Sequence, residues 1–246
     1  MKAKLIWIVL SLLCVALVPT VAYAQDEGIM KGDVEVMSGG KAYKSYLAAP
    51  AEQGTHPAIV LIHSFNGLEE GYRTMTDNLA TEGFVVLAVG WQTFSRDVDD
   101  ATLKQLIDDS VKFLGERQDV DMARLGLTGF CAGGRYTMLL LPQMDAFKAG
   151  VAWYGFPNRG ETAPKDLIGE LKSPMLIIHG TEDTASPIAD IYGYATALKE
   201  AGKYFELKVY AGEPHGFMLA QGQLRTDEIA QDAFNQMADF FKRKLK

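Results

Sequence analysis

The chain has 246 residues, of which 48% are hydrophobic and 22% charged, and its formal net charge is −7 at pH 7. This length suits one large α/β domain with a buried core, and the acidic balance argues against a nucleic-acid-binding protein. The same charge repels anionic substrates at long range unless an arginine compensates locally.

Residues 1–24 have the pattern of a secretory signal peptide. Two lysines precede an apolar run over 5–18, and Ala22-Tyr23-Ala24 offers small residues at the two positions that a signal peptidase reads. The alternative is a membrane anchor, but the run is shorter than the roughly 20 residues that a bilayer span needs. We expect export to the periplasm or the extracellular space, with cleavage leaving one domain over 25–246 and no stable membrane span.

The segment after the leader predicts a β-hairpin. Residues 25–31 are polar and we expect them to form a loose terminus. Residues 33–38 and 41–48 then alternate in the manner of strands and are joined by Gly39-Gly40, a common hairpin turn.

Buried strands alternate with helices along the rest of the chain. Continuous apolar runs such as 58–62 are typical of strands buried on both faces. We expect strands at 58–62, 84–89, 124–128, 149–153, 175–179 and 205–210, and helices at 72–81, 101–114, 132–141, 189–201 and 226–244. This alternation predicts an α/β fold with a mostly parallel sheet and helices on both faces. Ligands of such sheets bind beyond the carboxyl ends of the strands.

Cys131 lies in the stretch GFCAGG (129–134), between an expected strand and an expected helix. The only other cysteine, Cys14, lies in the leader, so the mature chain can form no internal disulfide. The thiol is either buried and inert or kept for chemistry. Gly129 and Gly133 leave the room that a nucleophile needs on a strained strand-to-helix turn, which favours chemistry. A thiol redox protein is less favoured because no CxxC pair is present.

Asp183 and His215 follow later expected strands, in HGTEDTASP and AGEPHGF. Asp183 alternatively caps a turn, and Glu182 is an adjacent competitor for its role. His215 is bracketed by Gly212, Pro214 and Gly216, which argues against a histidine packed in the core. The order nucleophile, acid, histidine is that of the α/β-hydrolases.

The other candidates are weaker. His63 and His179 stand at strand ends, where a structural role is favoured. Trp91 and Tyr154, with Trp153 and Phe156, are either a pocket wall or ordinary core aromatics. No spacing typical of a metal or nucleotide site occurs, so we expect neither a metal nor a cofactor.

At this point the chain resembles the dienelactone hydrolase family of α/β-hydrolases. The matching stretches are GFCAGGR (129–135), WYG (153–155), GTED (180–183) and PHGF (214–217). The resemblance implies an α/β-hydrolase fold and a triad of Cys131, His215 and Asp183. It also implies an oxyanion hole made by the backbone N–H groups of Ala132 and Phe65.

Two positions depart from that family. Ser64 stands where the dienelactone enzyme has a glutamate that helps to control the ionisation of the cysteine. Leu219 stands where it has one of two arginines that bind the substrate carboxylate, and Arg96 is a candidate for the other. We therefore place Ser64, Arg96, Trp91 and Tyr154 among the residues expected to bind substrate.

The predicted function is a cysteine-dependent hydrolase of a small ester or lactone that works through an acyl-thioenzyme. The alternative is a non-catalytic or weakly active binding protein on the same scaffold, which the changes at Ser64 and Leu219 would permit. A retained cysteine, acid and histidine in this order argue against a pure binder.

Overall fold

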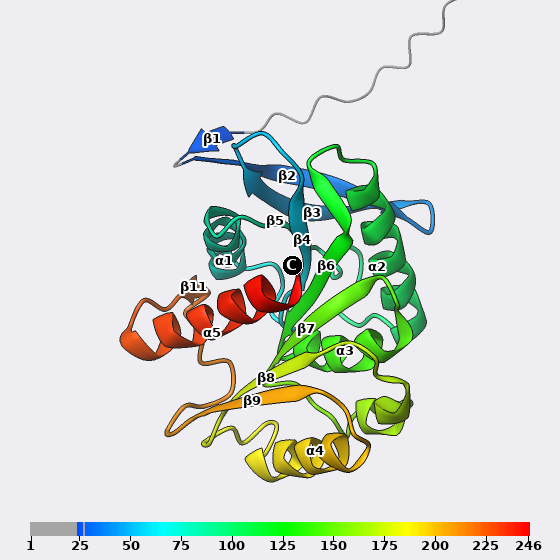
Figure 1. The fold of residues 1–246 in the computed structure, drawn as a ribbon, viewed down its shortest axis with the longest axis vertical. Helices are drawn as coiled ribbons and strands as arrows, with labels where there is room; N and C mark the ends of the chain where they lie inside the picture. The colour runs from blue at the N-terminus through cyan, green and yellow to red at the C-terminus, as the bar shows by residue number, and fades with distance from the viewer. Residues whose placement is uncertain (1–23, 27) are drawn as a thin grey trace, which may run out of the picture.

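A twisted nine-stranded sheet forms the centre of the protein, seen in a computed structural model that describes residues 24–26 and 28–246 (Figure 1). The leader predicted for residues 1–24 therefore lies outside the described residues except for Ala24. The strands are β1 (Ala24–Asp26), β2 (Ile29–Ser38), β3 (Lys41–Pro50), β4 (His56–Ile62), β5 (Val85–Val89), β6 (Val120–Phe130), β7 (Phe147–Trp153), β8 (Met175–Gly180) and β9 (Phe205–Tyr210).

The sheet is mostly parallel, as the sequence predicts. Its order is β1-β2-β3-β5-β4-β6-β7-β8-β9. The strands from β5 to β9 in this order pair in parallel, whereas the β2–β3 hairpin joins them through an antiparallel contact between β3 and β5. Consequently the carboxyl ends of β4, β6, β7, β8 and β9 meet along one edge, and the loops that follow them share that edge.

Helices cover both faces of the sheet (Figure 1). One face packs against α1 (Glu70–Thr81) and α5 (Glu228–Lys244), and the other against α2 (Asp100–Gly115), α3 (Ala132–Leu140) and α4 (Ile188–Glu200). Two short 3₁₀ helices, Leu141–Gln143 and Pro164–Glu170, complete the second layer. No helix within 24–26 and 28–246 is long and apolar enough to span a bilayer.

Two segments differ from the sequence-based expectation. The terminus expected to be loose instead carries backbone pairing, with Ala24 opposite Lys31 in the β1–β2 ladder, which side-chain polarity does not reveal. A small hairpin, β10 (Leu219–Ala220) and β11 (Gln223–Leu224), was not expected, because two-residue strands are too short to show a periodicity. Its turn has Gln221 and Gly222 at positive φ.

Arg225 clamps the long loop between β9 and α5. Its guanidinium donates to the Glu213 carboxylate at 2.6 Å and to the carbonyl oxygen of Phe217 at 2.7 Å. It also donates to Asp227 at 2.7 Å, and Asp227 caps the first turn of α5. The carbonyl oxygen of Glu213 in turn accepts from the backbone N–H of Glu182. One cation therefore holds the segment around His215 against both α5 and the loop after β8.

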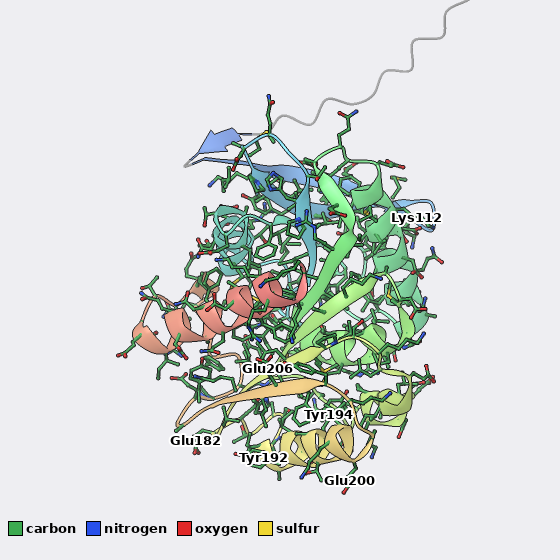
Figure 2. The ribbon with its side chains drawn as sticks, in the orientation of Figure 1. Lys112, Glu182, Tyr192, Tyr194, Glu200 and Glu206 are labelled. Carbon is green, nitrogen blue, oxygen red and sulfur yellow. The ribbon has the colours of Figure 1, made fainter. Side chains whose placement is uncertain are left out.

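We predict that Arg225→Met destabilises the fold by about 2–4 kcal/mol, because it leaves the buried Glu213 carboxylate without its charged partner. The matched control is Arg243→Met. Arg243 makes a similar two-pronged pair with Glu206 of β9, labelled in Figure 2, but this pair is exposed and should contribute about 1 kcal/mol or less. Urea unfolding followed by circular dichroism measures both. Equal losses in the two variants would contradict the clamp.

Candidate active site

Cys131 occupies a strained turn between β6 and α3. Its backbone has φ 57° and ψ −111°, a region that residues with a side chain rarely adopt. The flanking glycines are required by space, since a Cβ at Gly129 would lie 2.2 Å from the carbonyl oxygen of Gly133, and one at Gly133 would lie 2.0 Å from that of Ile62. The turn leaves the thiol half-buried at the N-terminus of α3, where the helix dipole favours negative charge.

His215 and Asp183 come together from the loops after β9 and β8. The Nδ1 atom of His215 lies 2.8 Å from Oδ2 of Asp183, whose side chain is fully buried. The imidazole shares a cavity with Cys131, whose sulfur is among the groups that raise the pKa of His215. The three side chains expected to form a triad therefore lie within one connected polar cluster, each at the carboxyl end of a different strand.

The charges around His215 favour its protonated form. Burial by itself lowers the pKa of the imidazole, but hydrogen bonds to Asp183 and then to Cys131 outweigh burial and raise the pKa to about 9. At neutral pH the ring is therefore an imidazolium flanked by a carboxylate and the sulfur. This is the arrangement that stabilises a thiolate beside it.

Asp183 is held in place by more than His215. Burial opposes ionisation, yet hydrogen bonds from His215 and from the backbone keep the pKa of Asp183 below its usual value. Its Oδ1 atom accepts from the N–H groups of Ala185 at 2.9 Å and Ser186 at 2.8 Å. Glu182, the adjacent competitor, is exposed at the edge of the molecule (Figure 2). Asp183 is thus the acid that faces the histidine.

His179 lies behind this pair and is fully buried. Its Nε2 atom is 2.8 Å from the carbonyl oxygen of Ser186 and 3.4 Å from Oδ2 of Asp183. Burial lowers its pKa, so the ring is neutral and donates from Nε2 to the carbonyl. His63 is likewise buried, stacks on Trp91 and has its pKa lowered to about 4 by burial. Both histidines are structural, as the sequence analysis favoured.

Two backbone N–H groups stand where an oxyanion hole is predicted. Ala132 is the first residue of α3, so its N–H has no acceptor within the helix. Phe65 follows β4 by three residues, and its N–H makes no hydrogen bond to the rest of the described chain. The next turn is held by Ser64, whose hydroxyl accepts from the N–H of Asn66 at 3.2 Å. Within the described residues both N–H groups are therefore without an acceptor.

A cavity of about 410 Å³ opens onto Cys131 and His215. Its walls come from the β4–α1 loop, α1, the turn after β7 and the β10–β11 hairpin, and they are lined by Ser64, Phe65, Asn66, Glu69, Tyr72, Tyr154, Gly216, Leu219, Gln221 and Gly222. Tyr154 has φ 35°, and its ring packs edge-on at 5.2 Å from that of His215. Of the residues expected to bind substrate, Ser64 and Tyr154 thus share the cavity with the thiol.

The other two expected substrate residues face elsewhere. Trp91 and Arg96 line a second cavity of about 440 Å³, which is bordered by Phe65 and Ala132 but not by Cys131. Trp91 is almost fully buried and donates from its indole to the carbonyl oxygen of His63. Arg96 stacks over the ring of Phe65, with 4.7 Å between the guanidinium carbon and the ring centroid.

Tyr72 and Glu69 are cavity residues that the sequence analysis missed. Tyr72 is buried, lines the cavity beside Ser64 and Cys131, and has its pKa raised by burial. Both residues lie at or near the start of a helix expected only from residue 72 onward. Nothing in their local sequence signals a site, because they reach the cysteine only through the packing of α1 against the sheet.

Comparison with known proteins assigns the family. The model of the dienelactone hydrolase family matches residues 43–98 and 89–245. A relative from Methylorubrum extorquens described as "Putative carboxymethylenebutenolidase" is 31% identical over 239 residues, which cover 87% of this chain and 81% of the relative. One of the same description from Escherichia coli K12 is 27% identical, covering 92% of each chain.

Solved structures agree with this assignment. The crystal structure described as "Putative Dienelactone Hydrolase" from Klebsiella pneumoniae superposes with a TM-score of 0.79 at 26% identity, and the match covers 87% of this chain and 99% of that one. The protein belongs to the dienelactone hydrolase family and is a hydrolase of the carboxylic ester or lactone type with the α/β-hydrolase fold.

Proposed function

We propose that the protein is a cysteine-dependent hydrolase of small esters or lactones that uses Cys131, His215 and Asp183 as a catalytic triad. The observation that carries the proposal is the cluster at the carboxyl edge of the sheet. A thiol on a strained turn faces an imidazolium, and that imidazolium is held 2.8 Å from a buried carboxylate. Packing alone would not require these three groups to meet beside an open cavity.

In the first half-reaction, the Cys131 thiolate attacks the carbonyl carbon of the substrate. A C–S bond forms, and the C=O electron pair moves to the oxygen, which the N–H groups of Phe65 and Ala132 stabilise as an oxyanion. When the intermediate collapses, the C–O bond breaks and the leaving alkoxide takes the proton from Nε2 of His215. Asp183 orients the ring throughout.

In the second half-reaction, the now neutral His215 removes a proton from water, and the resulting hydroxide equivalent attacks the thioester. The C–S bond breaks, the carboxylic acid leaves and the thiolate–imidazolium pair is restored. A lactone follows the same steps, except that its alcohol stays attached to the acyl group.

The substrate class is a small ester or lactone, in keeping with the 410 Å³ cavity. The relatives described as carboxymethylenebutenolidases are named for a lactone that bears a carboxylate. This chain has Leu219 in the cavity wall and Ser64 two residues after β4, so a different acyl group is expected here. We further propose that the protein is exported, on the signal-peptide pattern of residues 1–24.

We predict that Cys131→Ala lowers kcat/KM for p-nitrophenyl acetate by about 10³-fold or more, because no other group in the cavity supplies the nucleophile. Cys131→Ser should keep the fold and lose most activity. In the full, uncleaved chain, iodoacetamide should inactivate the wild type and the control Cys14→Ser alike. Turnover that survives both Cys131→Ala and alkylation would refute the mechanism.

We predict an alkaline limit to activity near the pKa of His215. The imidazolium supplies the proton to the leaving group, so kcat/KM should fall as pH rises through about 9. The hydrogen bond that Nδ1–H of His215 donates to Asp183 is the strongest of the influences that raise this pKa against the opposing effect of burial. Asp183→Asn should therefore move the alkaline limb to lower pH and reduce the rate.

The control for this pH profile is Glu182→Gln, which removes the neighbouring but exposed carboxylate. It should leave the alkaline limb where it is in the wild type. A limb that stays in place in Asp183→Asn, or that moves equally in both variants, would show that Asp183 does not set the protonation of His215.

A further inference from the structure

Glu69 places an uncompensated carboxylate in the wall of the Cys131 cavity. It precedes α1 at the N-cap position, but its side chain accepts no capping hydrogen bond. No described lysine or arginine pairs with it, although many of the other acidic side chains of the described chain make ion pairs. The N-terminus of α1, next to Glu69, favours a negative charge at this place.

The cavity contains no cation that would offset Glu69. None of its lining residues is a lysine or an arginine. The imidazolium of His215 is already balanced by the Asp183 carboxylate 2.8 Å away. The influence of Glu69 reaches the cavity interior, since burial raises the pKa of Tyr72, and the charges of Cys131 and then Glu69 raise it further.

The remaining walls suit a positively charged group. The rings of Phe65, Tyr72 and Tyr154 line the same space as the carboxylate. Aromatic faces attract ammonium groups through their electron-rich π systems, and more strongly when water is excluded. Tyr72 and Tyr154 are both nearly fully buried, so their rings form rigid walls.

The neighbouring cavity does not supply the missing positive charge. The arginine of that cavity, Arg96, shares the space with Asp97 and Asp99, and its guanidinium lies over the ring of Phe65. An anionic substrate would therefore meet a net negative environment on either side of the thiol.

We propose that Glu69 selects substrates by charge, so that the Cys131 cavity accepts esters or thioesters bearing an ammonium group and disfavours those bearing a carboxylate. This rests on the proposed function, in which Cys131 attacks the substrate carbonyl. Glu69 acts as a specificity residue and takes no part in proton transfer.

Charged thiol reagents test the field of Glu69 without requiring turnover. Two methanethiosulfonates are used, one carrying a trimethylammonioethyl group and the other a sulfonatoethyl group. In each case the thiolate forms a disulfide with the reagent and methanesulfinate leaves. Rates at Cys131 are measured by mass spectrometry, corrected for Cys14 with Cys131→Ala, and divided by the rates with free 2-mercaptoethanol.

The wild type should react faster with the cationic reagent than with the anionic one. Glu69→Gln should lower the ratio of these two rates by about fivefold, as expected when one nearby charge is removed from a partly shielded site. Glu70→Gln is the control, because Glu70 is the next residue, is exposed and does not line the cavity. A preference that is unchanged in Glu69→Gln, or lost equally in Glu70→Gln, overturns the proposal.

Two isosteric thioesters extend the test to turnover. Acetylthiocholine and S-(3,3-dimethylbutyl) thioacetate differ only in a quaternary nitrogen in place of carbon, and their hydrolysis is followed by pH-stat titration. The ratio of their kcat/KM values should fall in Glu69→Gln and stay constant in Glu70→Gln. If both thioesters are hydrolysed and the ratio of their kcat/KM values in Glu69→Gln equals that of the wild type, charge selection by Glu69 is refuted while the proposed function stands. If neither is hydrolysed, the proposed function is at fault, and the reagent rates still decide the role of Glu69.

Discussion

The positive φ of Cys131 is the constraint around which the carboxyl edge of the sheet is organised. A strained non-glycine residue costs about 1–3 kcal/mol and persists only where its surroundings leave no alternative. Here β6 is paired on both sides, with β4 and β7, and the Cys131 N–H donates to the carbonyl oxygen of Trp153. The close approach of Gly133 to Ile62 fixes how α3 leaves the sheet. The conformation of the backbone at Cys131 therefore determines the direction in which the sulfur points.

The polar groups that surround the thiol depend on the same strand order. Cys131 follows β6, Tyr154 follows β7, Asp183 follows β8 and His215 follows β9, and these strands are adjacent in parallel register. Each loop is then secured by its own hydrogen bonds, such as those from Ala185 and Ser186 to Asp183. Arg135 of α3 secures the loop after β7 in a similar way. It pairs with Asp100 at 2.7 Å and donates to the carbonyl oxygen of Arg159. Rigid supports of this kind preserve catalytic geometry better than the loops could alone.

Most of the side chains that line the Cys131 cavity are uncharged. Ser64 and Tyr72 share the cavity wall with Cys131, and Ser64 stands at the position where the resemblance to the dienelactone enzyme implies a glutamate. The positively polarised groups beside the sulfur are the His215 imidazole and the N-terminus of α3. Glu69 is the one carboxylate among the lining residues of this cavity.

The sequence by itself determined the fold class, the order of the longer strands and helices, and the order of Cys131, Asp183 and His215 after successive strands. These rest on local features: the 2- and 3.6-residue periodicities, the glycines around Cys131, and turn residues after each apolar run. Only the tertiary structure decided that Asp183 and not Glu182 faces His215, that Trp91 and Arg96 border a separate cavity, and that Tyr72 and Glu69 line the one at the thiol. The reason is that these residues meet through contacts between segments that are distant along the chain. A strand's apolar pattern states that it is buried, but not which neighbour's loop its last residues will face.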